Sequence, residues 1–108
     1  MITINVAKDF TRYPAGRKKT AGPTSGEEFR EKFLVPHIKN RDRIKIELDG
    51  TIGYGSSFLE EAFGGLVRAG LTSQEIQSRI EMRSSDKSLI EEIITYINDQ
   101  SQNSNPHK

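Results

Sequence analysis

Short runs in which hydrophobic and polar residues alternate predict three β-strands along the chain. The first begins at Ile2 and is expected to end near Asp9, and the other two cover residues 43–49 and 80–83. Because alternating side chains point to opposite faces of a strand, each run presents one apolar face and one polar face. Three strands of this kind predict a small sheet that buries a single face.

Hydrophobic residues at helical spacing predict one helix after Ser25 and a second over residues 56–68. Ser25 and Glu28 have the spacing of a capping box, which marks the start of the first helix. Pro36 is expected to limit how far this helix continues, because proline lacks an N–H and clashes with the preceding turn. Gly70 is expected to end the second helix.

Two further helices are predicted in the C-terminal third of the chain. Thr72 and Glu75 form another capping box, which opens a short helix. The last helix has an apolar stripe and is expected to be capped by Ser85 or Asp86. The polar residues 100–108 predict a disordered C-terminal tail.

The order of these elements indicates an α/β fold, with a short, mostly parallel or mixed sheet and helices packed on it. The chain has 108 residues, 33% of them hydrophobic, which fits one domain, predicted to span residues 1–99. Ligands and partners of such sheets usually meet the loops at the carboxyl ends of the strands. Here those loops are residues 10–26 and 50–57, so the two glycine-rich segments form the candidate site.

The helix predicted for residues 56–68 carries a polar face opposite its apolar stripe. At about 100° per residue, this face contains Ser57, Glu60, Glu61, Gly64 and Arg68. A glycine inside a helix costs about 1 kcal/mol relative to alanine, and packing within the domain gives no reason for one on an outer face. Either Gly64 leaves a flat patch for the backbone of a protein partner, or the helix is merely frayed there.

Two interpretations are open for Ser56 and Ser57 at the start of this helix. Serine is a common N-cap residue and needs no further function there. A phosphate on one of them would also be stabilised, because free amides and the helix dipole favour negative charge at an N-terminus. Such a phosphate would repel an acidic docking partner.

The net charge of +1 gives no overall field that would favour nucleic acid or a membrane as partner. One loop is nevertheless basic, because no acidic residue lies between Asp9 and Glu27. Its basic residues are Arg12, Arg17, Lys18 and Lys19. The loop is suited to bind nucleic acid, an acidic protein or the phosphates of a nucleotide that is bound to a partner.

Several classes of function lack the residues they need. The chain contains no cysteine, which excludes disulfides, thiolate metal sites and cysteine nucleophiles. Its N-terminus has no long apolar run of the kind found in a signal peptide or a membrane span, so a cytoplasmic protein is expected. His37 has no partner at metal spacing, and His107 lies in the predicted tail. We therefore expect a protein that has no metal site or cofactor and is not an enzyme.

Three alternatives stay open beside a protein-binding role. Residues 53–58 follow a predicted strand and open a helix, as a dinucleotide fingerprint does, but Phe58 stands where glycine or alanine is required. Asp9 and Asp49 at the ends of neighbouring strands are suited to hold Mg²⁺ for phosphate chemistry, although such carboxylates are more often caps. The edges of a small sheet also allow a homodimer.

Two stretches of the chain carry a family resemblance, IKIELDG at residues 44–50 and GSSFLEEAFGGL at residues 55–66. They resemble the STAS-like family of uncharacterised domains, which are bacterial and archaeal relatives of anti-sigma-factor antagonists. Upstream, PAGR at residues 14–17 and GPTSG at residues 22–26, with Phe29 and Arg30, match the N-terminal loop and helix of the family. The resemblance spans residues 2–98.

The resemblance implies a regulatory role. In the antagonists, an Asp-Ser-Ser motif at this helix start contains the serine phosphorylated by a kinase of the histidine-kinase-like ATPase fold. By similarity Ser57 is the acceptor, Ser56 precedes it, and Gly55 stands where the antagonists carry Asp. We thus predict a partner-switching module whose partner is such an ATPase or its regulator. The predicted contact surface combines the polar face of residues 56–68 with the basic loop of residues 12–25.

Overall fold

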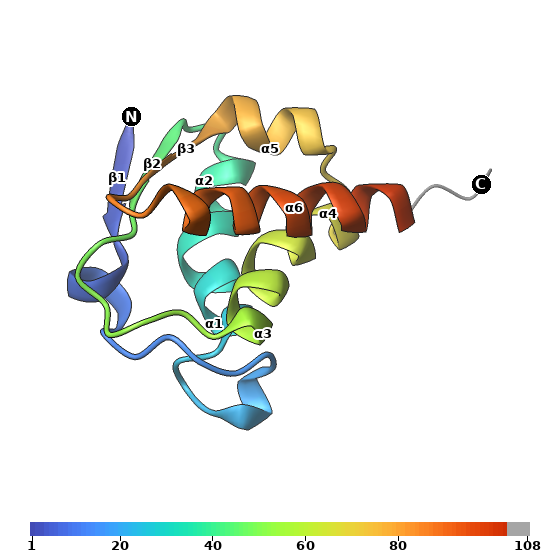
Figure 1. Cartoon of the computed structure of the whole chain (residues 1–108). Coiled ribbons are helices and arrows are strands. Elements are labelled where there is room, and N and C mark those ends of the chain that lie inside the picture. The colour runs from blue at the N-terminus through green and yellow to red at the C-terminus, as the bar shows by residue number, and fades with distance from the viewer. Residues whose placement is uncertain (104–108) are drawn as a thin grey trace.

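The computed structural model describes residues 1–103 and contains one sheet of three parallel strands (Figure 1). The strands lie in the order β1 (Ile2–Asn5), β2 (Ile44–Glu47) and β3 (Ile80–Arg83). Ile2 pairs with Ile44, which pairs in turn with Ile80. The prediction of an α/β fold with a small, mostly parallel sheet is therefore confirmed.

The helices lie on one side of the sheet (Figure 1). A first helical segment joins α1 (Gly26–Phe29), the π-helical η3 (Arg30–Leu34) and α2 (Val35–Lys39). A second joins α3 (Ser56–Leu59), the π-helical η4 (Glu60–Gly64) and α4 (Gly65–Arg68). The remaining helices are α5 (Ser73–Arg79) and α6 (Lys87–Asn103), together with the short turns η1 (Val6–Phe10) and η2 (Lys19–Ala21). Among the described residues, no helix is long and apolar enough to cross a membrane.

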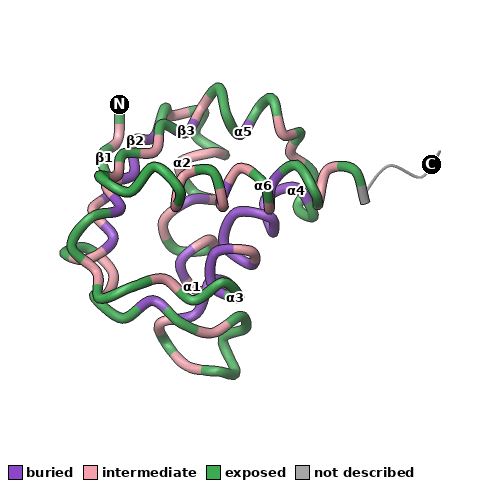
Figure 2. Tube along the Cα trace, in the orientation of Figure 1, coloured by how far each residue is buried: buried purple, intermediate pink, exposed green. Residues whose placement is uncertain are grey.

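The second helical segment lies at the centre of the fold (Figure 2). All of its residues from Phe58 to Val67 are buried except Glu60. The sheet contributes alternate residues such as Ile44 and Ile46, while α6 contributes Ile93 and Ile97. The opposite face of the sheet carries polar residues, which follows from the period of two along each strand.

The first strand is shorter than predicted. It ends at Asn5, and the chain then turns into η1 instead of continuing toward Asp9. The Asn5 side chain accepts a hydrogen bond from the Lys8 N–H at 3.0 Å, and the Asn5 N–H donates to the Asp9 carboxylate at 2.8 Å. These local side-chain bonds offer the backbone an alternative to the strand, which an alternating pattern alone does not reveal.

Pro36 limits the first helical segment less than expected, because the helix passes the proline before it ends. The N–H of Val35 donates to the carbonyl of Arg30, five residues earlier, and α2 continues to Lys39 with Pro36 in its first turn. Proline is tolerated in a first turn, where its missing N–H removes no helical bond. The wider π turn therefore lets the helix restart around the proline.

The predicted caps are found, and the last helix is longer than expected. The Ser25 hydroxyl accepts from the Glu28 N–H at 3.1 Å, and the capping box of Thr72 and Glu75 is complete. Asp86 caps α6 by accepting from the Ser88 N–H at 3.0 Å. Residues 100–103, predicted to be disordered, belong to α6, whereas the rest of the predicted tail, with His107, lies outside the described residues.

Candidate functional site

The two glycine-rich loops meet at the carboxyl edge of the sheet, as the strand order predicts. The N–H of Ile52 donates to the carbonyl of Arg12 at 2.9 Å, and the N–H of Gly55 donates to the carbonyl of Pro14 at 3.3 Å. The loop before α1 therefore lies directly beside the loop that leads into α3. Residues from distant parts of the sequence thus surround the start of the serine-bearing helix.

Ser57 is exposed in the first turn of α3, and it does not cap the helix. Gly55 is the N-cap residue, and glycine has no side chain that could bond to the free amides there. Ser56 is also exposed but lies within hydrogen-bond reach of the Tyr96 hydroxyl in α6. A β-carbon on Gly55 would meet no atom closer than 3.9 Å, so packing does not require glycine at this position.

Glu60 and Glu61 lie within a cluster of basic side chains from three parts of the chain. The Glu61 carboxylate is 3% exposed and lies 2.9 Å from Arg30 Nη1, 3.1 Å from Arg68 Nη2 and 3.4 Å from Lys18 Nζ. Glu60 pairs with Arg68 at 2.8 Å and also with Arg17. We call this set the Glu61 cluster: Arg17, Lys18, Arg30, Glu60, Glu61 and Arg68.

The expectation that Glu61 and Gly64 face outward is wrong, because both are buried. The helix widens into a π turn at η4, so the ideal spacing of about 100° per residue does not hold there, and α6 packs on this face. A β-carbon on Gly64 would lie 2.7 Å from Glu60 Oε2 and 3.6 Å from the carbonyl oxygen of Tyr96. Gly64 is therefore an internal packing position, neither a flat outer patch nor a frayed end. Glu60 and Arg68 remain partly accessible.

Two other glycines allow the Glu61 cluster to form. A β-carbon on Gly65 would overlap the guanidinium of Arg30, which also donates to the backbone carbonyl of Glu61. On the facing helix, a β-carbon on Gly26 would overlap the carbonyl oxygen of Phe58. The two helical segments thus approach closely on both sides of the buried Arg30–Glu61 pair. Sequence reasoning missed Arg30, since its partner lies 31 residues away.

The basic loop is not a uniform patch of free charge. Arg17 and Lys18 belong to the Glu61 cluster, and Lys19 pairs with Glu31. Arg12 is exposed, and its side chain forms no ion pair within residues 1–103. Three of the four basic residues of the loop are therefore already paired with glutamates among the described residues, and Arg12 is the exception.

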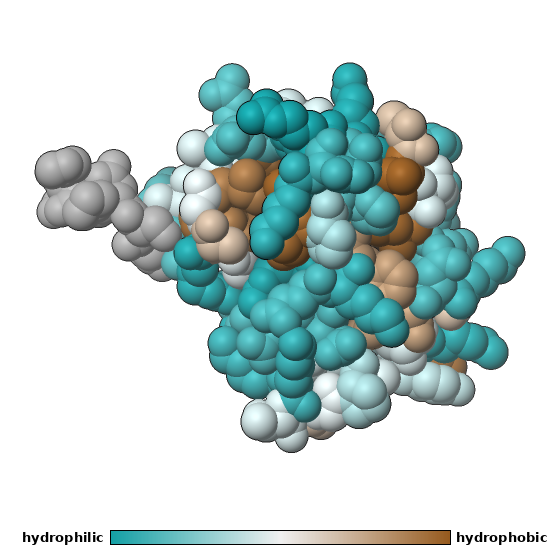
Figure 3. All heavy atoms as spheres, turned by 180° about the vertical axis from the view of Figure 1, so that it is seen from behind, coloured by the Kyte–Doolittle hydropathy of each residue, from teal (hydrophilic) through white to brown (hydrophobic). Residues whose placement is uncertain are grey.

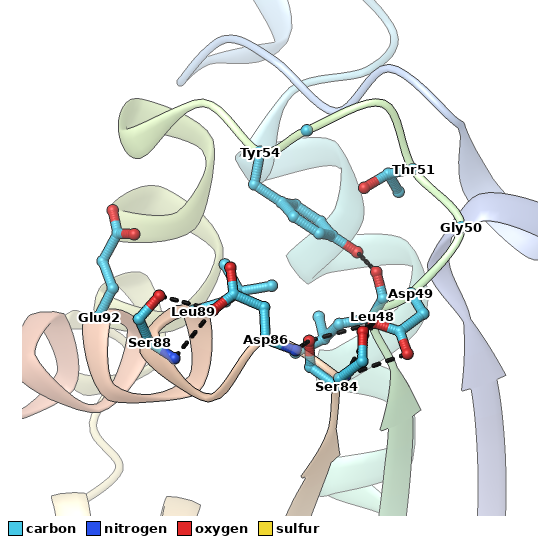
Figure 4. Close-up of a pocket in the computed structure, with 12 residues that line it drawn as sticks. Leu48, Asp49, Gly50, Thr51, Tyr54, Ser84, Asp86, Ser88, Leu89 and Glu92 are labelled. Carbon is cyan, nitrogen blue, oxygen red and sulfur yellow. Dashed lines mark hydrogen bonds between the residues drawn. The ribbon is translucent and has the colours of Figure 1, made fainter.

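An open pocket of about 540 Å³ lies between the end of β2 and the start of α6 (Figure 4). Tyr54 donates to the Leu48 carbonyl at 2.7 Å, and burial raises the pKa of Tyr54 to about 12. Asp49 accepts from the Ser85 N–H at 3.0 Å, and this bond holds the pKa of Asp49 below its ordinary value. Glu92 and Asp86 add negative charge to the lining, which disfavours a bound phosphate.

Asp9 and Asp49 each accept a hydrogen bond from a backbone N–H, which is the capping role that competed with a magnesium site. Within residues 1–103, no group of three or more metal-ligating side chains is placed to hold an ion.

On the rear of the molecule, apolar residues are visible among hydrophilic ones (Figure 3). A shallow groove of about 190 Å³, between α2 and α4, is lined by Val35, Ile38 and Leu66 among others.

The Glu61 cluster predicts a specific loss of stability in acid. Burial alone would raise the pKa of Glu61, but the hydrogen bond from Arg30 and the charges of Arg68 and Arg30 outweigh it and lower the pKa. The pKa of Glu60 is likewise lowered, because bonds from Arg68 and Arg17 outweigh burial. These glutamates therefore take up protons at a higher pH in the unfolded state than in the folded state. The stability that they contribute is present above about pH 4.3, the ordinary glutamate pKa, and it is lost as the pH falls through their lowered pKa values in the folded state.

Urea unfolding followed by circular dichroism across the acid range would measure this dependence. We expect the free energy of unfolding of the wild type to fall more steeply with acid than that of Glu61→Gln, which has one carboxylate fewer to protonate. Equal slopes for the two proteins would contradict the assignment to Glu61.

A family model described as a STAS-like domain of unknown function matches residues 25–89, which is more than half of the chain. The match contains α1, β2, the helix that begins at Ser56 and β3. The N-terminal loop, which meets the helix that begins at Ser56, precedes the matched residues. No curated protein and no solved structure matches the chain.

Proposed function

Because the chain belongs to the family of STAS-like domains of unknown function, we propose that it is a non-catalytic regulatory module that binds a protein partner. In this proposal the partner docks at the carboxyl edge of the sheet, and phosphorylation of Ser57 controls the docking. By the resemblance to anti-sigma-factor antagonists, the kinase is a histidine-kinase-like ATPase, and the partner is such an ATPase or its regulator.

The observation that carries this proposal is that Ser57 is exposed at the start of its helix. The residue does not cap the helix, so its hydroxyl is not committed to a structural role. Ser56 is the weaker candidate, because the Tyr96 hydroxyl is within hydrogen-bond reach of its side chain. The free amides of the first turn lie next to Ser57 and favour a phosphate group there.

The Glu61 cluster supports the same assignment. Ser57 precedes Glu60 and Glu61 by three and four residues, so the serine lies about one turn before the cluster along the helix. Four cations in the cluster face two carboxylates, which leaves an excess of two positive charges one turn from the serine. A phosphate on Ser57 would therefore meet opposite charge, and Arg17 and Lys18 are the members exposed enough to turn toward it.

The test is mass spectrometry of the chain purified from its native host, on the tryptic peptide of residues 46–68. We expect one phosphate on this peptide in the wild type and in Ser56→Ala, and none in Ser57→Ala. Co-purifying proteins are compared between the wild type and Ser57→Asp, and we expect the mimic to lose the partner. An unmodified peptide, together with the same partner on wild type and Ser57→Asp, would contradict the proposed switch.

A further inference from the structure

Large apolar side chains are exposed on the two loops that meet beside the serine helix. The side chains of Tyr13 and Ile52 belong to residues that are 62% and 68% exposed, and Met1 is the other large hydrophobic residue so exposed within residues 1–103. The bond from the Ile52 N–H to the carbonyl of Arg12, at 2.9 Å, joins the two loops at the residue before Tyr13. Single exposed apolar residues are ordinary, but a joined pair at a functional edge is a candidate contact.

The backbone beneath this pair is held in place. The N–H of Tyr13 donates to the Thr11 hydroxyl at 3.1 Å, and the following Pro14 is buried. The N–H of Ala15 donates to the carbonyl of Thr24 at 3.2 Å. Because the loop is already ordered, a partner that binds these side chains pays little conformational entropy.

The charge beside the pair is positive and unneutralised. Arg12 precedes Tyr13 and forms no ion pair within the described residues, whereas Arg17, Lys18 and Lys19 of the same loop are each paired with a glutamate. Tyrosine and arginine are the residue types most often found as energetic hot spots of protein interfaces. A surface of one free guanidinium, one phenol ring and one aliphatic side chain complements a segment that is both acidic and apolar.

We propose that Arg12, Tyr13 and Ile52 form a docking patch for an acidic segment of a partner protein that carries a large apolar or aromatic side chain. The segment places its carboxylate on Arg12 and its apolar side chain between Tyr13 and Ile52. The inference rests on the proposed function in naming a protein as the partner. It also accounts for the switch, since Gly55 N–H bonds to Pro14 and a phosphate on Ser57 would repel an acidic segment nearby.

The test uses the unphosphorylated full chain and a display library of short random peptides. We expect selection to enrich peptides in which Asp or Glu lies next to Trp, Phe, Tyr or Leu. Labelled peptides from the enriched set are then titrated against Arg12→Glu and against the double variant Tyr13→Ala with Ile52→Ala. Each should bind about tenfold more weakly than wild type, or worse, as expected for hot-spot residues.

Lys39→Glu is the matched control, because Lys39 is an exposed base at the opposite edge of the domain, and it should bind like the wild type. Circular dichroism establishes that each variant is folded. Selection of no acidic and apolar peptides, or equal affinity of the patch variants, would overturn the patch. The patch would also be overturned if no peptide is selected and these variants lose the binding of single-stranded oligothymidine. The surface would then be a nucleic-acid surface instead. Ser57→Asp in the same titration separates the two proposals, since unchanged affinity would contradict the switch and leave the patch supported.

Discussion

Replacing Glu61 by alanine is expected to destabilise the domain by about 3 kcal/mol, the lower end for breaking a buried pair, because it removes the carboxylate that neutralises a largely buried guanidinium. The side chain of Arg30 is 12% exposed, and its Nη1 lies 2.9 Å from Glu61 Oε2. Without that carboxylate the charge of Arg30 would remain in the interior with only the Glu61 backbone carbonyl as its partner in the neighbouring helix. Since small domains are stable by about 5–15 kcal/mol, the loss is a large fraction of the total and is measurable by urea unfolding.

Glu60→Ala is the matched control for this prediction. Glu60 belongs to the same cluster, but its side chain is 23% exposed and pairs with Arg17 and Arg68, which are more exposed still. We expect it to cost about 1 kcal/mol or less. A double variant in which Arg30→Met accompanies Glu61→Leu should recover part of the stability, because no charge is then left buried without a partner. Similar losses for Glu60→Ala and Glu61→Ala would show that the buried pair is not the main contribution.

The Glu61 cluster also connects stability to the proposed function. Arg17 and Lys18 reach from the N-terminal loop to the helix that begins at Ser56. These ion pairs help to hold the loop beside Ser57 and beside the exposed Tyr13. A phosphate on Ser57 and the carboxylates of Glu60 and Glu61 would then compete for the same cations. Phosphorylation of Ser57 would therefore alter the position of the N-terminal loop as well as the charge of the surface.

Most of the fold follows from local sequence patterns. Alternation predicted the strands, and the third lies at Ile80–Arg83 as expected. Helical spacing predicted the central helix, and capping signals located the starts of α1 and α5. Local patterns did not show the π turns at η3 and η4, since the apolar residues there recur at ordinary α-helical spacing. These turns carry the first helix past Pro36 and bury residues that an ideal wheel places outside.

The site was predicted in part. The meeting of residues 10–26 with residues 50–57 follows from a parallel sheet, in which all carboxyl ends lie at one edge. The sequence also singled out the four basic residues of the loop, but it could not show that three of them pair with Glu60, Glu61 and Glu31. Such pairs join residues up to 43 positions apart and have no local signature. For the same reason the exposure of Tyr13 and Ile52 became evident only in the folded chain.

Gly26→Ala is the second substitution for which a large effect is expected, about 3 kcal/mol of lost stability. A β-carbon at this position would overlap the carbonyl oxygen of Phe58 and lie 3.0 Å from the backbone nitrogen of Ala62. Both atoms belong to the backbone of a buried helix, so they cannot rotate aside as a side chain can. The helices would have to separate, which would loosen the packing around the Arg30–Glu61 pair. Urea or thermal unfolding measures the loss.

Gly64→Ala gives the comparison that distinguishes close helix packing from a general intolerance of alanine. Its β-carbon would meet first the end of the flexible Glu60 side chain, at 2.7 Å, and the nearest backbone atom, at 3.6 Å, is at ordinary contact distance. The gain in helix propensity, about 1 kcal/mol, opposes the cost of moving Glu60, so we expect stability close to that of the wild type. Equal losses for the two variants would contradict the close approach at Gly26. A loss confined to Gly26→Ala would locate the tightest contact where α1 crosses the helix that begins at Ser56.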